Sequence, residues 1–541
     1  MPQMTGGQAI VSELILNGTE VVFGLPGAQI YGLFDALHEY DVRVIGARHE
    51  QGCAYMALGY ARASGRPGVY AVVPGPGMLN ASAALLTAYG CNAPVLCLTG
   101  QVPSAFFGRG RGHLHEMRDQ LATLRQITKW AERIEHPAAA PSLVAQAFQQ
   151  MRSGRPGPAA LEMFWEQFSE VAEVSPVGPL PDLPQPPLDP QRIDQAVSMI
   201  KDARAPMIMV GGGAVDAGAH VLELAEMLDA PVVALRNGRG VVTEAHDLSL
   251  NIASGFHLWP DTDLVIAIGT RLELVEWRWK QRPKNLKTIR IDIDPAEMRR
   301  YPSDVSIVAD SVVATAALTE AMRKRGVQSS RRRELIRMAK EKAAREIESV
   351  QPQIGYLQVI RDVLPDDGIF VDDLSQVGFA SWFGFPVYHP RTYITSGYQG
   401  TLGSGLGTAL GVKVARPDKP VVSVCGDGGF MFAVQELATA VQYKINCVVI
   451  VINNGSYANV LRDQQTRFRG RVVGAELHNP DFVKLAESFG VEARRVTSPS
   501  ELRAPLEYAL AQDAPFLIEI VVGRGEEASP WTFIHPEPKR G

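Results

Sequence analysis

Short apolar runs that each end in a glycine-rich turn and precede a helical pattern recur along the whole chain, and they constrain the fold more than any other feature. They occupy residues 21–27, 69–77 and 93–100, then 206–213, 263–271 and 288–294, then 368–373, 420–429 and 446–454. Strands that are apolar throughout and alternate with helices are typical of parallel sheets buried on both faces. We therefore expect an α/β protein of three domains, each with a parallel sheet flanked by helices.

The stretches between these groups predict where the domains end. Proline is so frequent in residues 171–190 that neither a helix nor a central strand can persist there. A basic, helix-favouring run near residues 323–346 separates the second group from the third. At 541 residues the chain is too long for a single hydrophobic core. The expected division is 1–170, a linker at 171–190, 191–325, a linker and helix at 326–355, and 356–541.

Composition excludes several classes of partner. The formal net charge is only -5, which argues against nucleic acid as a partner. The start of the chain lacks a basic segment followed by a long apolar core, and no apolar run approaches the ~20 residues of a membrane span. The five cysteines contain no C-x-x-C pair, so buried thiols are expected rather than disulfides or a zinc site. These features predict a cytoplasmic protein that acts on a small molecule.

Two polar turns follow neighbouring strands in the last third of the chain. One strand runs into Gly426-Asp427-Gly428-Gly429, and after one helix the next strand stops at Asn453-Asn454-Gly455. Both turns are expected at the carboxyl edge of one sheet, where open α/β proteins bind ligands. Glycines let backbone amides approach diphosphate oxygens, and Asp427, Asn454 and a nearby carbonyl offer the oxygen ligands that Mg²⁺ prefers. Either turn alone would be an ordinary turn, but the two together predict a metal-diphosphate site.

This arrangement resembles the motif of thiamine diphosphate (ThDP) enzymes, in which GDG is followed after roughly thirty residues by NN. Other stretches occur in the order seen in the acetohydroxyacid (acetolactate) synthase-like family: "NGTEVVFGLPGAQIYGLFDAL", "RHEQGCAYMALGYARASGRPGV", "GPGMLN", "TSGYQGTLGSGLGTALG" and "HNPDFVKLAESFGVEARRV". The family has a pyrimidine-binding, a middle and a diphosphate-binding α/β domain, which matches the three segments. The resemblance implies ThDP and Mg²⁺ as cofactors.

The same resemblance assigns roles to individual residues. Glu50, in "HEQ", corresponds to the glutamate that bonds to N1′ of the cofactor's pyrimidine, and a carboxylate partly removed from water suits that proton sharing. A helix-capping charge is the alternative for Glu50 taken by itself. The Gly400 carbonyl is expected to accept from the 4′-amino group, and Leu402 to be a buried apolar wedge beneath the cofactor.

The resemblance also implies further contacts, with Asn80 opening the helix that follows a tight turn. The cofactor contacts that it implies are Pro26, Gly27, Gly75, Asn80, Gly426, Asp427, Gly428, Gly429, Asn454, Ser456 and Tyr457, with Asp427, Asn454 and Ser456 as metal ligands. Since the glutamate and the metal motif come from different subunits in this family, a homodimer with its active site at the interface is expected, and a dimer of dimers is plausible.

Leu114-His115-Glu116 is the nearest match to the family's "FQE" segment near the active site. His115 could transfer protons to or from an oxygen of the substrate. The alternative is that His113 and His115 lie in a surface loop and have no catalytic role. Gln29, at a position that is usually small in the family, would add a polar contact facing the substrate.

Departures from the family concern the substrate. Arg271 is retained, but Val275 replaces the second arginine that helps hold a 2-keto acid, and Asp463 replaces a tryptophan near the substrate. These changes argue against a specific biosynthetic acetohydroxyacid synthase. We expect an enzyme that makes or breaks a carbon–carbon bond next to a carbonyl. An acetolactate synthase-like carboligase acting on 2-keto acids is the first choice, and a lyase or hydrolase of a 2-hydroxyketone or diketone is the second.

Other classes of function predict different residues. A non-catalytic regulatory relative would lack one of the essential groups, yet Glu50, Asp427 and Asn454 are all present. A nicotinamide dehydrogenase needs G-x-G-x-x-G, which "GGGAVDAGAH" does not supply. FAD is not expected, because "SLNIASGFHLWPDTD" is shorter than the corresponding region of FAD-binding relatives and lacks their "GMHG" turn.

Overall fold

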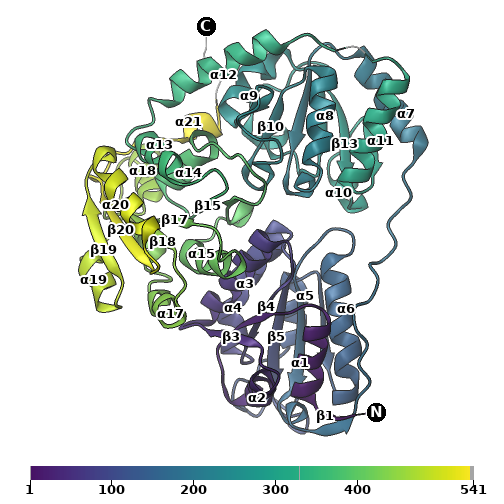
Figure 1. The fold of residues 1–541 in the computed structure, drawn as a ribbon, viewed down its shortest axis with the longest axis vertical. Helices are drawn as coiled ribbons and strands as arrows, with labels where there is room; N and C mark the ends of the chain where they lie inside the picture. Colours follow the sequence, from purple (N-terminus) through teal and green to yellow (C-terminus); the bar gives the residue numbers. More distant parts are fainter. Residues whose placement is uncertain (1, 328, 537–541) are drawn as a thin grey trace.

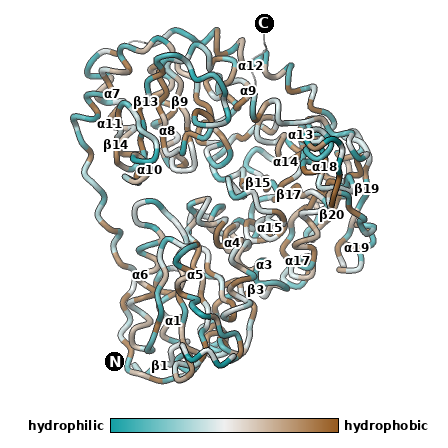
Figure 2. Tube along the Cα trace, turned by 180° about the vertical axis from the view of Figure 1, so that it is seen from behind, coloured by the Kyte–Doolittle hydropathy of each residue, from teal (hydrophilic) through white to brown (hydrophobic). Residues whose placement is uncertain are grey.

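Three six-stranded parallel sheets carry the fold in the computed structural model, which describes residues 2–327 and 329–536 (Figure 1). Helices cover both faces of each sheet, so most central strands are buried and largely apolar, whereas the edge strands β3, β6 and β19 carry charged residues. Figure 2 shows hydrophobic segments along β17 and β20. The expected α/β class with three parallel sheets is confirmed.

The first sheet has the strand order β3-β2-β4-β5-β7-β6, and all its pairs are parallel. Its strands are β2 (Val21–Gly24), β3 (Arg43–Gly46), β4 (Gly68–Val72), β5 (Val95–Gln101), β6 (Trp130–Ile134) and β7 (Ala159–Phe164). The helices are α1 (Gly6–Leu16), α2 (Tyr31–Glu39), α3 (Glu50–Ser64), α4 (Pro76–Cys91), α5 (Gln120–Ile127) and α6 (Ala140–Arg152).

The second sheet has the order β11-β10-β9-β12-β13-β14 and is also parallel. Its strands are β9 (Pro206–Val210), β10 (Val232–Ala234), β11 (Ser249–Leu250), β12 (Leu264–Ile268), β13 (Lys287–Asp292) and β14 (Val305–Val308). The helices are α7 (Pro190–Asp202), α8 (Gly218–Leu228), α9 (Ile252–Leu258), α10 (Pro295–Arg300) and α11 (Ser311–Lys324).

The third sheet has the order β16-β15-β17-β18-β20-β19. Its parallel strands are β15 (Ile369–Asp372), β16 (Tyr393–Ile394), β17 (Val421–Gly426), β18 (Val448–Asn453), β19 (Glu492–Val496) and β20 (Phe516–Val521). The helices are α12 (Arg333–Ile347), α13 (Gln353–Val363), α14 (Gln376–Gly384), α15 (Ser404–Ala415), α16 (Asp427–Phe430), α17 (Glu436–Tyr443), α18 (Ala458–Arg467), α19 (Phe482–Ser488), α20 (Pro499–Ala511) and α21 (Trp531–Ile534).

The segments between the sheets differ in structure. β1 (Gln3–Thr5) pairs antiparallel with β8 (Val171–Glu173), so the start of the proline-rich stretch is tied to the first domain. The rest of that stretch has no regular secondary structure up to α7, and it runs along the outside of the molecule (Figure 1). No helix in the described residues is both long and apolar enough to cross a membrane. The five cysteines are buried and unpaired, as expected.

The first and third domains meet where α3 lies along α15, and glycines set the distance between the two helices (Figure 1). A Cβ at Gly59 would lie 2.0 Å from the main-chain oxygen of Thr408, and one at Gly411 would lie 1.9 Å from that of Met56. A larger side chain at either position would force the helices apart, because interiors tolerate little added volume. Each helix follows a loop assigned to the cofactor, so this contact positions both loops.

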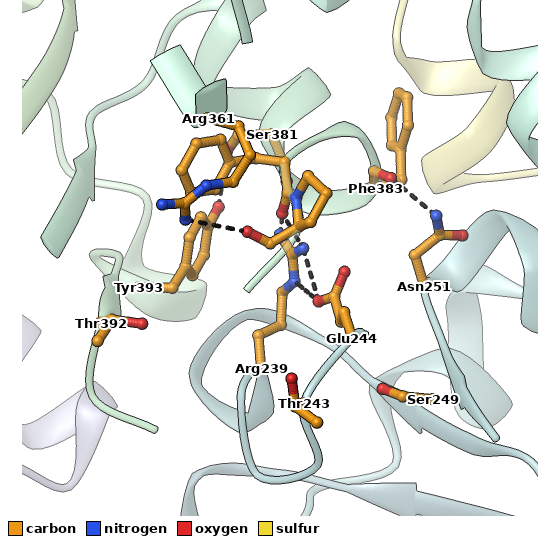
Figure 3. Close-up of polar contacts among 12 residues, drawn as sticks. Arg239, Thr243, Glu244, Ser249, Asn251, Arg361, Ser381, Phe383, Thr392 and Tyr393 are labelled. Carbon is orange, nitrogen blue, oxygen red and sulfur yellow. Dashed lines mark hydrogen bonds and ion pairs between the residues drawn. The ribbon is translucent and has the colours of Figure 1, made fainter. Parts of the chain in front are cut away.

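The middle and third domains are joined by Arg239, which is 2% exposed (Figure 3). Its guanidinium donates to the main-chain oxygens of Ser381 (2.5 Å) and Phe385 and to Glu244 Oε1 (2.7 Å from Nη2). It also lies over the ring of Tyr393, at 4.8 Å from the centroid. A buried cation with all of these partners fixes the angle between two domains.

Replacing Arg239 by alanine should lower the free energy of unfolding by about 3 kcal/mol or more, because the Glu244 carboxylate, which is only 12% exposed, and two main-chain carbonyls lose their donor. The measurement is thermal or urea unfolding of the purified variant. Arg391→Ala is the control. Arg391 forms an ion pair with Asp216, whose side chain is 71% exposed, so its loss should change the free energy of unfolding by less than about 1 kcal/mol. Equal, small effects of the two substitutions would contradict the interpretation.

Candidate active site

Glu50 is the first residue of α3, and contacts from two other segments fix its position. Asn80 on α4 donates from Nδ2 to Glu50 Oε2 at 3.0 Å. From the third domain, the buried carboxylate of Glu436 accepts hydrogen bonds from the main-chain amides of Arg48 (3.2 Å) and His49 (3.1 Å). The turn that carries Glu50 is therefore held by residues of both domains.

One detail differs from the sequence-based expectation. Asn80 does not open α4, because the helix already begins at Pro76, directly after Gly75 adopts a φ of 57°. Glu50 is half-buried in the single chain, and Gly77 lies close to it. A Cβ at Gly77 would be 3.4 Å from Glu50 Oε1. One side of this carboxylate thus remains accessible to a second group.

Gln29 and His115 lie far apart in the sequence and are brought together in the structure. Gln29 is fully buried after β2, and its Nε2 donates to the main-chain oxygen of Leu114 at 3.0 Å. Its Oε1 lies 3.1 Å from His115 Nδ1. The amide oxygen can only accept, so Nδ1 of His115 is assigned as the donor, and Nε2 of a neutral ring is left as an acceptor.

The turn at Gly75 connects this pair to the neighbourhood of Glu50. A Cβ at Gly75 would lie 2.5 Å from the main-chain oxygen of His115, so only glycine allows this contact. His115 itself adopts a φ of 64°, in the left-handed region. His113 instead stacks on Phe106 within its own loop, with ring centroids 4.1 Å apart. The geometry thus ties His115, and not His113, to the Gly75 turn.

Asp427 lies at the carboxyl end of β17 and is 2% exposed. Its Oδ1 accepts from the Gly428 amide at 2.8 Å, and its Oδ2 accepts from the Gly455 amide at 2.8 Å and Asn479 Nδ2 at 2.7 Å. Burial raises the pKa of Asp427, and these hydrogen bonds oppose that effect. Within the described residues, no ion pair reaches this carboxylate.

Asn454 and Ser456 follow β18, the neighbour of β17. Asn454 Oδ1 accepts from the Ser456 amide (3.0 Å) and hydroxyl (2.9 Å), and Asn454 Nδ2 donates to Glu527 Oε2 at 2.5 Å. Burial raises the pKa of Glu527 to about 7. Because Gly455 lies between Asn454 and Ser456 and bonds to Asp427, the expected metal ligands are gathered at one edge of the sheet.

Glycines at the GDGG turn allow neighbouring groups to pack directly against its backbone. A Cβ at Gly428 would lie 2.4 Å from the ring of Tyr457, and one at Gly426 would lie 3.2 Å from the main-chain oxygen of Leu374. A Cβ at Gly429 would lie 3.2 Å from Asp373 Oδ2. Gly428 and Gly429 are buried and Gly426 is half-buried, so glycine is what allows these groups to pack so closely against the turn.

The remaining expected cofactor contacts lie in two loops. Gly400 has a φ of 56°, which favours glycine, and precedes α15. Leu402 is half-buried in the single chain, which differs from the buried position expected for it. Pro26 is exposed and Gly27 is half-buried, both directly after β2. The structure therefore places all these residues at domain edges.

Sequence reasoning missed several polar groups at the carboxyl edge of the third sheet. Asp372 ends β15 and Asp373 follows it in "FVDD", and this carboxylate pair at a strand end was the available signal. Asn479 falls in "HNPDF", where no spacing rule connects it to Asp427. Glu527 lies in the loop "GRGEEASP" after β20, and no pattern there distinguishes it from its neighbour Glu526.

The residues present fit a divalent cation that bridges a diphosphate. Asp427 and Glu527 are buried carboxylates, and Glu527 Oε1 has no hydrogen-bond partner. A cation would offset their charge, and amide and main-chain oxygens beside them are ligands that Mg²⁺ accepts. Among residues 2–327 and 329–536, no group of three or more His, Cys, Asp or Glu side chains is placed to bind a metal, so amide and main-chain oxygens would have to contribute.

The groups around Glu50 and Asp427 remain separate within one chain. In the described part of the chain, Glu50 contacts α4, and Asp427 contacts the loops after β18 and before α19, with no hydrogen bond joining the two sets. A site that takes one of these carboxylates from each of two subunits remains a prediction.

A cavity of about 560 Å³ lies beside the middle domain. Its lining includes Gly211, Arg236, Arg271, Glu297 and Tyr398. The guanidinium of Arg271 donates to the main-chain oxygen of Gly90 at 3.1 Å and lies over the ring of Tyr398. The absence of FAD remains a prediction.

Asp372 gives a pH-dependent contribution to stability. It is buried beside Asp373, and burial raises its pKa to about 7 although Trp382 Nε1 (3.1 Å) and the Tyr393 hydroxyl (3.2 Å) donate to it. A carboxyl whose pKa is raised by folding stabilises the protein at low pH, and this contribution is lost as the pH rises from about 4 to about 7.

Asp372→Asn should therefore gain stability relative to the wild type as the pH rises from 5 to 8, because asparagine cannot ionise. The measurement is the melting temperature of the cofactor-free protein across this range. Asp418→Asn, at an exposed pair with Arg416, serves as the control. A difference between Asp372→Asn and wild type that does not change with pH would contradict the raised pKa.

Comparison with known families matches all three domains. Residues 4–123, 193–318 and 373–520 match the N-terminal TPP binding domain, the central domain and the C-terminal TPP binding domain of thiamine pyrophosphate enzymes. These three matches follow the order of the three sheets.

Individual relatives extend over nearly the whole chain. A probable acetolactate synthase large subunit of Methanocaldococcus jannaschii is 33% identical over 97% of this chain and 93% of its own length. A probable 2-ketoarginine decarboxylase AruI of Pseudomonas aeruginosa is 32% identical, covering 96% and 94%. An acetolactate synthase of Arthrospira platensis is 32% identical, covering 98% and 96%.

Proposed function

The chain belongs to the acetolactate synthase-like family of thiamine pyrophosphate enzymes, and from this premise we propose that it makes or breaks a carbon–carbon bond next to a carbonyl with ThDP and Mg²⁺. The substrates would be 2-keto acids or related carbonyl compounds. The observation that carries this proposal is the Asp427–Gly455–Asn454 arrangement beside the GDGG backbone, in a chain that also holds Glu50 against Asn80. When bound, ThDP supplies the carbanion chemistry.

The residues of this chain would bind and orient the cofactor. Asp427, the amide oxygen of Asn454 and Ser456 would hold the cation, and the Gly426–Gly429 backbone would border the diphosphate. Glu50 would exchange a proton with a ring nitrogen of the pyrimidine, and Asn80 would keep its carboxylate in place. A second subunit would bring these two groups together.

The proposed assembly is at least a homodimer. Glu50 is only half-buried, and apolar side chains beside both groups are exposed: Leu79 (47%) precedes Asn80, and Phe432 (49%) follows the GDGG turn. Burying such side chains in an interface removes apolar surface from water. The same interface would cover Glu50 and lower the polarity around it.

Gln29 and His115 would act on the substrate. The bond from His115 Nδ1 to Gln29 leaves Nε2 able to take up or deliver a proton at a substrate oxygen. The Gly75 turn lies against the main chain of His115 and leads into α4, which carries Asn80 beside Glu50.

A lyase or hydrolase of a 2-hydroxyketone or diketone is the second candidate. Val275 is 5% exposed where the family's second arginine would be, and Arg271 is already bonded to a main-chain oxygen and stacked on Tyr398. A substrate carboxylate would therefore lack the two-arginine clamp, which favours a neutral carbonyl compound.

The proposed activity is tested by incubating the protein with ThDP and Mg²⁺ and a panel of 2-keto acids, aldehydes and diketones, with products identified by mass spectrometry. The panel includes 2-ketoarginine, because one relative is named a probable 2-ketoarginine decarboxylase. Turnover of 2-keto acids supports the first candidate, and turnover of neutral carbonyl compounds alone supports the second. No turnover and no ThDP binding would overturn both.

Glu50→Gln should reduce kcat by about 100-fold or more, because a general acid or base contributes 10²–10⁴-fold and glutamine cannot exchange this proton. Glutamine retains an oxygen for Asn80, so the fold should persist, as checked by circular dichroism. Glu39→Gln, an exposed change on α2, is the control with unchanged kcat. Wild-type turnover in Glu50→Gln would exclude the proposed role.

His115→Gln should lower kcat by roughly 100-fold while ThDP binding is preserved, because only proton transfer at the substrate is lost. His113→Gln is the matched control in the same loop, and its kcat should stay within about twofold because it contacts Phe106 and not Gln29. If both variants lose activity to the same extent, the loop rather than the His115 imidazole is responsible.

A further inference from the structure

Glu527 is a buried carboxylate that neither the sequence patterns nor the proposed function uses. It lies in the loop after β20 and is 7% exposed. Its Oε2 accepts from Asn454 Nδ2 at 2.5 Å, and its Oε1 has no hydrogen-bond partner in the described structure. A buried carboxylate oxygen without a partner costs free energy unless another group meets it.

The nearest cation does not meet that oxygen. Arg462 on α18 donates to the main-chain oxygen of Glu527 at 3.2 Å, to Gln376 Oε1 at 2.9 Å and to Ser529 Oγ at 3.4 Å. Among the described residues, no hydrogen bond links its guanidinium to the Glu527 carboxylate. Burial raises the pKa of Glu527 and the charge of Arg462 opposes that rise, yet Oε1 is left without a hydrogen-bond partner in the described part of the chain and open to another group.

Glu527 also fixes which end of the Asn454 amide faces which neighbour. An ionised carboxylate can only accept hydrogen bonds, so the NH₂ group of Asn454 must point toward Glu527. The amide oxygen then points to the other side, where the amide and hydroxyl of Ser456 donate to it. Without Glu527, the amide could turn over and place its NH₂ group where a metal ligand is needed.

We propose that Glu527 is a further acidic member of the metal-diphosphate centre. It keeps the Asn454 oxygen on the side of the divalent cation, and its free oxygen accepts a hydrogen bond from a water molecule in the coordination shell of that cation. This inference rests on the proposed function. Mg²⁺ keeps several waters when bound to protein, and residues that orient ligands and waters contribute strongly to metal affinity.

That residue 527 is a glutamate, and not a neutral residue, argues against a role only in holding Asn454 in place. A glutamine at position 527 could accept the same hydrogen bond from Asn454 without placing a charge in the interior. Replacing buried charges by neutral groups of similar size is often neutral or stabilising for the fold. Since the fold does not need the negative charge of Glu527, we assign that charge to binding of the divalent cation.

Glu527→Gln tests this assignment, and Glu526→Gln is the matched control. Glu526 is adjacent, exposed, and bonded only to the Gly523 amide at 3.0 Å within its own loop. Mn²⁺ affinity is measured by electron paramagnetic resonance at saturating ThDP. We expect Glu527→Gln to weaken Mn²⁺ binding by about 10- to 100-fold and Glu526→Gln to leave it within about twofold.

The melting temperature of the cofactor-free protein provides the second measurement. It should be equal or higher in Glu527→Gln, because a buried charge is removed, and addition of ThDP and Mg²⁺ should raise it less than in the wild type. A lower melting temperature without ligands would show that the carboxylate serves the fold, and it would overturn the proposal. If Glu527→Gln does not fold, Glu527→Asp replaces it, with weaker Mn²⁺ binding again expected.

The outcomes separate this inference from the proposed function. Wild-type protein that binds ThDP and Mn²⁺, together with unchanged Mn²⁺ affinity in Glu527→Gln, would overturn the role of Glu527 alone. Wild-type protein that binds neither ligand would overturn the proposed function and this inference with it.

Discussion

The contact between α3 and α15 is the constraint on which the rest of the structure depends. Gly59 and Gly411 allow the two helices to approach until main chain meets main chain, which joins the first domain to the third. α3 begins at Glu50, and α15 follows the loop with Gly400 and Leu402. Since both functional loops lead directly into these helices, a shift between the helices would displace both loops.

The third domain concentrates unfavourable charge where its sheet ends. Asp372, Asp427 and Glu527 are buried, and burial raises the pKa of each. Such positions cost stability in the ligand-free protein and are characteristic of binding sites, where a ligand provides the missing counter-charge. The buried Arg239 and the helix pair supply the rigidity that keeps these carboxylates in place.

Much of the fold could be predicted from the sequence, because most central strands are largely apolar and glycine-rich turns follow several of them. The metal-diphosphate residues were also predictable, since two polar turns on neighbouring parallel strands must meet at one edge of the sheet. Asn479 and Glu527 were not, because they reach Asp427 and Asn454 through loops whose course depends on tertiary packing. The contact between Gln29 and His115 could not be predicted either, although each residue was a candidate site residue by itself. Glu50 and Leu402 are only half-buried in the single chain, so the sequence alone could not fix how much of each side chain the fold covers.

The central claim is that Glu50 of one subunit and Asp427 of another act on one cofactor. It is tested most directly by co-expressing Glu50→Gln and Asp427→Asn chains with different tags and isolating the mixed population. Each mixed dimer then has one intact site of its two, so mixed dimers purified through both tags should have about half of wild-type activity, whereas either variant alone should be nearly inactive. Purified mixed dimers without activity above that of the separate variants would contradict the shared site.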